Sequence, residues 1–189
     1  MAKNIKLSSM GFILDEDKAA VWRGPMLSGA IRQLMQSTLW GDLDILFIDM
    51  PPGTGDAQLT LSQRVQLGGA IIVSTPQDLS LIDARKGLNM FKKVNVPILG
   101  IIENMSYFVC SNCEKKHPIF GNGGAKIEAE KLGVPFLDEI PLDIKLRTTS
   151  DEGKPIVEEE PDHIISQKYM DIGSRIIETI IKNKKVSPV

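Results

Sequence analysis

The stretch Phe47–Asp56, FIDMPPGTGD, decides the fold, because a short apolar run gives way within it to a loop of proline and glycine. Residues 43–48 are mostly apolar, and such a run, bounded by turn residues, predicts a buried strand. Asp49 then lies at the carboxyl end of that strand, where a carboxylate can hold Mg²⁺ through water. The amides of Gly53 and Gly55 follow, and glycine-rich loops can bring backbone N–H groups to a phosphate. The stretch predicts either a metal and phosphate loop or an ordinary turn after a strand.

Three more apolar runs have the length of strands. The first stops before Pro76, the second begins beside Pro97, and the third stops at Pro141, so each is bounded by a residue that interrupts regular structure. The predicted strands span residues 70–73, 96–102 and 134–140.

Helical patterns separate these three strands. Apolar residues recur at helical spacing over 78–95, with Asp78 as the predicted N-cap, and 124–132 predicts a second helix that ends at Gly133. Strands that alternate with helices predict an α/β fold, a mostly parallel sheet flanked by helices. Sheets of this kind bind ligands at the carboxyl ends of their strands.

Two amphipathic patterns lie outside this alternation, over residues 27–35 and 165–180. The second is rich in isoleucine and is followed by lysines, which is compatible with a membrane-targeting helix, but its wide apolar face favours docking on the sheet. The acidic segment 148–162, with its glycine and proline, predicts a surface connection. Without repeats or linkers, we expect a single domain over residues 1–189.

The composition excludes several classes of protein. With 189 residues, 42% of them hydrophobic, the chain can bury a core, and a net charge of −2 disfavours nucleic acid and stable membrane association. No run is long enough to span a bilayer, and no secretory signal is visible at the start. We expect a cytoplasmic protein, or a mitochondrial one if a targeting segment preceded this sequence.

The only two cysteines, Cys110 and Cys113, lie three residues apart in a polar loop over 108–118. Two thiolates at this spacing can bind one metal, whereas a cubane iron–sulfur cluster needs four ligands, so the other two must come from elsewhere. A zinc site and a thioredoxin-like redox pair are the alternatives. His117 is not counted as a ligand, because a solvated charged loop accounts for it and its neighbouring lysines.

Polar residues also follow two of the predicted strands. Asn104 comes after the strand at 96–102, and its amide can bond the edge of a purine. Pro141 and Asp143 follow the strand at 134–140 and are candidates for a second wall of the same purine site. Asparagine and proline are also ordinary turn residues, so the alternative is a pair of turns.

Six motifs in one order resemble the Mrp/ApbC family of MinD-like P-loop ATPases. They are WRGPM at 22–26, DMPPGTGD at 49–56, STPQD at 74–78, ENMS at 103–106, FGNGG at 120–124 and IPLD at 140–143.

This resemblance implies ATP hydrolysis coupled to the transfer of a [4Fe–4S] cluster to apoproteins. The cluster would bridge Cys110 and Cys113 of two subunits, in a homodimer or in a heterodimer with a related chain. Asp49 would be the catalytic residue, with its carboxylate ordering Mg²⁺. ATP would contact Pro52, Gly53, Gly55, Asn104, Pro141 and Asp143.

No glycine-rich turn with a lysine and a following serine or threonine occurs in these 189 residues. In the family that P-loop lies before WRGPM, so we expect an N-terminally truncated, partial P-loop domain. ATPase activity is therefore expected only conditionally. The alternative function is a non-catalytic metal-binding or regulatory module.

Overall fold

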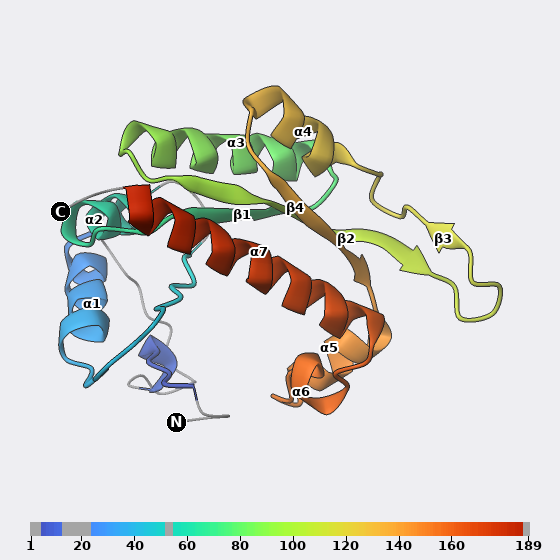
Figure 1. Cartoon of the computed structure of the whole chain (residues 1–189), viewed down its shortest axis with the longest axis horizontal. Helices are drawn as coiled ribbons and strands as arrows, with labels where there is room; N and C mark the ends of the chain where they lie inside the picture. Colours follow the sequence, from blue (N-terminus) through green and yellow to red (C-terminus); the bar gives the residue numbers. More distant parts are fainter. Residues whose placement is uncertain (1–4, 13–23, 52–54, 187–189) are drawn as a thin grey trace. The chain divides into compact units, whose positions relative to one another are not determined.

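The computed structural model (Figure 1) describes residues 5–12, 24–51 and 55–186. The chain divides into two compact units. Unit 1 comprises Met1–Gln66 and unit 2 comprises Leu67–Val189. A single domain over 1–189 stays a prediction. The sheet and the cysteines belong to unit 2, while the DMPPGTGD motif belongs to unit 1.

The helices and strands that the structure describes in unit 1 are all helices. A 3₁₀ helix at Met10–Phe12 precedes α1 (Gly24–Gln36) and α2 (Asp56–Arg64). The two α-helices pack together, with Ala30 and Leu61 buried. The helix predicted around 27–35 is confirmed as α1.

The strand predicted for residues 43–48 is wrong. These residues form neither helix nor strand, and the Phe47 side chain is 70% exposed. A strand must pair its backbone N–H and C=O groups with a neighbouring strand. The described part of unit 1 contains no strand with which this apolar run can pair, so an apolar sequence alone does not make it part of a sheet.

The sheet of unit 2 is built around one long central strand. Strand β2 (Ile98–Val109) is parallel to β1 (Ala70–Ser74) and to β4 (Phe136–Leu142), and antiparallel to the short β3 (Lys116–His117). The mostly parallel sheet and its three predicted strands are confirmed. The second and third of these strands were predicted to end too early, because β2 continues past Asn104 and β4 passes through Pro141. Proline is tolerated there because β4 pairs on one side only among the described residues.

Helices cover both faces of this sheet (Figure 1). On one face, α3 (Asp78–Lys93) and α4 (Gly124–Leu132) pack on the sheet, and on the other α7 (Ile164–Val186) does. The first core contains Ile72, Leu81, Leu88, Ile101, Ala125 and Ala129, and the second contains Leu99, Leu137, Ile140, Ile172 and Ile176.

The isoleucine-rich C-terminal helix therefore docks on the sheet, as predicted. Burying apolar side chains on both faces supplies the main stabilising term of unit 2. Within the described residues, no helix combines the length and the apolar character needed to cross a membrane.

Two smaller predictions need correction. The N-cap of α3 is Gln77, and Asp78 is instead the first helical residue, where its negative charge complements the helix dipole. The segment 148–162 is not a plain connection, because it holds the end of α5 (Ile144–Asp151) and the short α6 (Ile156–Glu159). Ile156 is buried, which anchors this segment and explains the regular structure within it.

The start of α4 approaches the loop after β1 too closely for any side chain at Gly124. A Cβ there would lie 2.7 Å from the Pro76 carbonyl oxygen and 2.8 Å from Leu81 Cδ1. We expect Gly124→Ala to lower the free energy of unfolding by about 1–3 kcal/mol, the usual cost of overpacking. Urea unfolding followed by circular dichroism measures this.

Gly87→Ala is the matched control, because Gly87 lies inside α3 and an added Cβ would meet nothing within 4 Å. That variant should gain about 0.5–1 kcal/mol from helix propensity. Equal unfolding midpoints for the two variants would contradict the close packing at Gly124.

Candidate metal centre and nucleotide cavity

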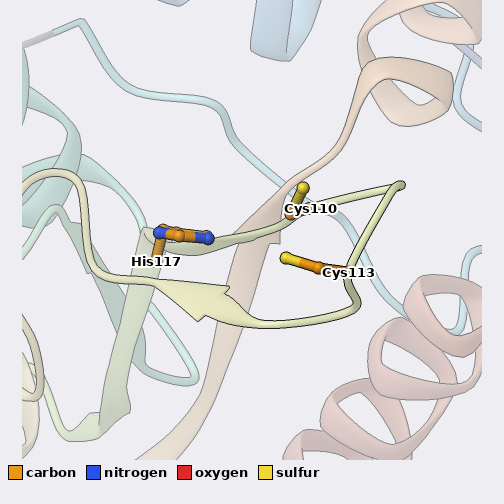
Figure 2. Close-up of side chains that lie close together, drawn as sticks. All are labelled: Cys110, Cys113 and His117. Carbon is orange, nitrogen blue, oxygen red and sulfur yellow. The ribbon is translucent and has the colours of Figure 1, made fainter.

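A β-hairpin at the end of β2 carries both cysteines (Figure 2). Phe108 on β2 pairs with His117 on β3, which fixes the register of the two arms. The backbone N–H of Cys110 donates to the Lys115 carbonyl at 3.0 Å, which extends the pairing into the turn. The polar loop predicted over 108–118 is therefore a paired hairpin, and its register determines where the thiols lie.

Three metal-ligating side chains meet on this hairpin. One ligand atom each from Cys110, Cys113 and His117 lies within 4.8 Å of the other two (Figure 2). Cys110 is partly buried, while Cys113 and His117 are exposed. The structure thus brings the two predicted cysteines together and adds His117, which sequence reasoning had left out. The signal was its position four residues after Cys113, which becomes meaningful only once the chain turns back as β3.

The Cys110 thiol lies in a polar environment. The backbone N–H of Asn112, then that of Cys113, and the Cys113 thiol hydrogen-bond to its sulfur and lower the pKa of Cys110. Hydrogen bonds to sulfur favour the thiolate, which is the form that binds metal and attacks electrophiles. The hairpin therefore favours metal binding at Cys110.

This lowered pKa predicts the pH dependence of alkylation. In the metal-free, reduced chain, Cys110 reacts with iodoacetamide through its thiolate. The pH at which this reaction reaches half its maximal rate should be lower in the folded chain than in urea, because the thiolate forms at lower pH. The measurement is mass spectrometry of the Cys113→Ser variant over a pH series. The midpoint is the readout, since the intrinsic nucleophilicity of a thiolate falls with its pKa. A folded-state midpoint equal to or above the urea value would contradict the backbone hydrogen bonds.

A separate cavity of about 600 Å³ opens where β2 and β4 deliver their polar residues. Asn104, Pro141 and Asp143, the three residues predicted to hold adenine, all line it. Phe108 and Tyr169 add aromatic surface. Small-molecule sites are typically about 300–1,000 Å³, mostly apolar, with a few placed polar groups. The cavity is thus large enough for a nucleotide base, and its use for adenine stays a prediction.

Two of the cavity residues also have local structural roles. Asp143 is the N-cap of α5, and its Oδ1 accepts from the backbone N–H of Leu146 at 2.8 Å. Asn104 Oδ1 accepts from the N–H of Met105 at 3.0 Å, where the backbone has a φ of 55° and the pairing with β4 shifts register. The pair of turns considered as the alternative is not observed, because Asn104 and Pro141 lie within β2 and β4 and Asp143 caps a helix. The two hydrogen bonds hold the Asn104 and Asp143 side chains beside the cavity.

Glu103 is the site residue that the sequence reasoning missed. It is fully buried on β2, and its carboxylate accepts from Ser106 Oγ at 2.7 Å and from the N–H groups of Gly123 and Ala125 at 3.2 and 2.7 Å. Those amides are at the start of α4, so Glu103 caps that helix from a neighbouring strand. Ser106 precedes the hairpin in the chain and Gly123 follows it, so this carboxylate links the two segments that flank the hairpin.

The phosphate-loop residues belong to unit 1. Asp49 is exposed in the irregular segment before α2, and Gly55 is the N-cap of α2. Pro52 and Gly53 lie outside the described residues. The buried Gln58 of α2 donates from Nε2 to the Pro51 carbonyl at 2.8 Å, which ties the helix to the loop before it. The phosphate and magnesium roles of these residues stay predictions.

Known proteins resemble this chain over nearly its whole length. A model of the ParA family, described as NUBPL iron-transfer P-loop NTPase, matches residues 1–177. The iron–sulfur cluster transfer protein NUBPL of Dictyostelium discoideum is 53% identical over 93% of this chain and 54% of its own length. An Arabidopsis thaliana iron–sulfur protein required for NADH dehydrogenase, mitochondrial, is 50% identical over 92% of this chain and 55% of its own. The iron–sulfur cluster carrier protein of Salmonella typhimurium is 48% identical over the whole chain and 51% of its own length.

Solved structures also resemble this chain. A nucleotide-binding protein from Archaeoglobus fulgidus, in complex with ADP and with cobalt, is 44% identical with a TM-score of 0.64, over 72% of this chain and 56% of that one. The cell-division ATPase MinD of Pyrococcus furiosus shares the fold, with a TM-score of 0.57 over 82% of this chain and 59% of that one, at 23% identity. The chain spans about half the length of the curated relatives it matches. On this sequence match, with the MinD-like parallel sheet, the chain belongs to the NUBPL iron-transfer family of P-loop NTPases.

Proposed function

We propose that this chain carries the cluster ligands and part of the nucleotide site of an ATP-dependent iron–sulfur carrier, which delivers a [4Fe–4S] cluster to apoproteins. The observation that carries the proposal is the pair of thiols, Cys110 and Cys113, held together on an exposed hairpin. Relatives of about 50% identity are named for cluster transfer, and that naming supports the same chemistry.

The cluster is cargo, and its geometry implies a second chain. A cubane cluster takes four protein ligands, and the cysteines of one chain supply two. Cys113 is exposed at the turn, where a second hairpin can approach it. We therefore infer a homodimer, or a heterodimer with a related subunit, in which two hairpins bridge one cluster. A bridged cluster can be released when the two hairpins separate.

Each of the two units carries residues that we propose for nucleotide chemistry. In unit 2, Asn104, Pro141 and Asp143 would hold adenine in the cavity that they line. In unit 1, Asp49 would order Mg²⁺ through water, and the loop of Pro52, Gly53 and Gly55 would contact the phosphates. ATP binding would then set whether the two hairpins are held together or apart. We expect the cytoplasm as the compartment, with mitochondria as the alternative, since the name of the Arabidopsis relative includes that location.

Anaerobic reconstitution tests the carrier proposal. The purified chain is incubated with ferrous iron and sulfide, and then its visible absorption, iron content and mass in solution are recorded. About four irons per two chains, bound to a dimer, would support the bridged cluster. A colourless monomer would overturn the carrier role of this chain and favour the alternative of a metal-binding or regulatory module.

A further inference from the structure

We propose that His117 joins Cys110 and Cys113 in a mononuclear metal site, which binds one zinc-type divalent ion on a single chain. This site shares the hairpin with the proposed carrier function but does not depend on it, because one ion needs neither a second chain nor sulfide. The fourth coordination position faces solvent and is open to water or to an incoming ligand.

The register of the hairpin places His117 beside the thiols. His117 pairs with Phe108, and Cys110 is two residues beyond Phe108. Side chains two residues apart on an extended strand project from the same face, so His117 and Cys110 are diagonal neighbours on one face of the hairpin. The turn between the arms then brings Cys113 back towards both of them (Figure 2).

The distances suit a tetrahedral ion. With zinc–sulfur bonds of about 2.3 Å and zinc–nitrogen bonds of about 2.0–2.1 Å, the ligand atoms of a tetrahedral site lie about 3.5–3.8 Å apart. In the structure the three ligand atoms are within 4.8 Å of one another. Closing this gap takes inward movement of about 1 Å, which rotation of exposed side chains supplies. Two thiolates and one imidazole, with an open fourth position, match known zinc chemistry.

The hairpin itself is held in place, so the ligands are partly organised before a metal arrives. The Lys116 ammonium lies over the Tyr107 ring, 4.2 Å from its centroid, and so joins the two arms beside the site. The Cys110 N–H to Lys115 bond closes the turn on the other side. Organised ligands lower the entropic cost of binding, as they do for any ligand.

Titration of the reduced, metal-free chain with Co²⁺, without iron or sulfide, tests this site. Co²⁺ is a spectroscopic stand-in for Zn²⁺, with thiolate charge-transfer bands and d–d bands whose intensity reports tetrahedral geometry. We expect one ion per chain on a monomer. His117→Ala should weaken the affinity about 100-fold or more, since losing even an outer partner of a ligand commonly costs 10–100-fold. The d–d bands of that variant should also change.

The second histidine provides the matched control. The chain has only two histidines, and His163 is engaged elsewhere, with its Nδ1 accepting from the N–H of Ile165 at 3.3 Å. His163→Ala should leave affinity and spectrum unchanged, and on adding Zn²⁺ only the His117 ring resonances should shift in NMR spectra. Equal Co²⁺ affinity for His117→Ala and the parent chain would overturn the proposal, as would one ion per two chains. Either result could coexist with a bridged cluster, so the two proposals fail separately.

Discussion

Serine at both Cys110 and Cys113 should reduce the iron bound after anaerobic reconstitution from about four per two chains to background. Cys110 and Cys113 are the only cysteines of the sequence and the proposed cluster ligands, and the serine hydroxyl does not replace a thiolate towards iron at neutral pH. The visible charge-transfer absorption should disappear with the iron. If the cluster bridges two chains, the dimer that forms during reconstitution should also be lost. Metal analysis, absorption spectra and mass in solution are the three measurements.

The fold of the double variant should be unaffected, because Cys113 is exposed and Cys110 is only partly buried. Its free energy of unfolding should stay within about 0.5 kcal/mol of the parent, as for most surface changes. Ser111→Ala, in the same exposed turn, is the control that keeps both thiols. Full iron binding by the double variant would show that the cluster ligands lie elsewhere in the chain.

The elements of unit 2 could be predicted because their signals are local. The helix at Gly124–Leu132 was predicted with its observed ends, because Gly133 adopts the left-handed conformation that ends helices, with a φ of 64°. The strands at 70–73 and 134–140 were recognisable as short apolar runs bounded by proline. Each of these elements is specified by residues within itself or next to it.

The errors arose where structure depends on distant parts of the chain. Residues 43–48 have the composition of a buried strand, but a strand also needs a neighbour, which composition does not reveal. The hairpin at 108–118 was read as a loop because β3 is only two residues long and polar. The place of His117 beside the cysteines follows from that pairing, so missing the hairpin also meant missing the third ligand.

The residue types of the candidate site could be predicted from the sequence. The buried residues that hold the site in place were harder to predict. The wall formed by Asn104, Pro141 and Asp143 follows from the rule that ligands bind at the carboxyl ends of parallel strands. Glu103 was quoted within ENMS, yet a buried carboxylate has no distinctive sequence pattern. Its role depends on α4, whose first residues lie about 20 positions later and become its partners only in the folded sheet.

Replacing Glu103 with alanine should give the largest loss of stability of any single change considered for unit 2. The substitution leaves the N–H groups of Gly123 and Ala125 without their acceptor, while Ser106 Oγ keeps a second acceptor, Glu139 Oε2 at 3.2 Å. Each buried unsatisfied group costs about 1–3 kcal/mol, and with partial relaxation we expect a total of about 3–5 kcal/mol. Urea unfolding followed by circular dichroism gives this value, and faster hydrogen exchange at Gly123 and Ala125 locates the effect.

Two further variants distinguish the hydrogen bonds that Glu103 accepts from the effect of its negative charge. Glu103→Gln keeps one acceptor oxygen but turns an NH₂ group towards donors, so its loss should fall between those of the parent and of Glu103→Ala. Glu130→Gln, on the exposed side of α4, removes one negative charge from the helix that Glu103 caps and should change stability by about 0.5 kcal/mol at most. If Glu103→Ala unfolded at the same urea concentration as Glu130→Gln, the carboxylate would not be holding α4. We also expect Glu103→Ala to loosen the hairpin whose flanking segments Glu103 links. Metal binding at Cys110 and Cys113 should then weaken although neither cysteine has changed.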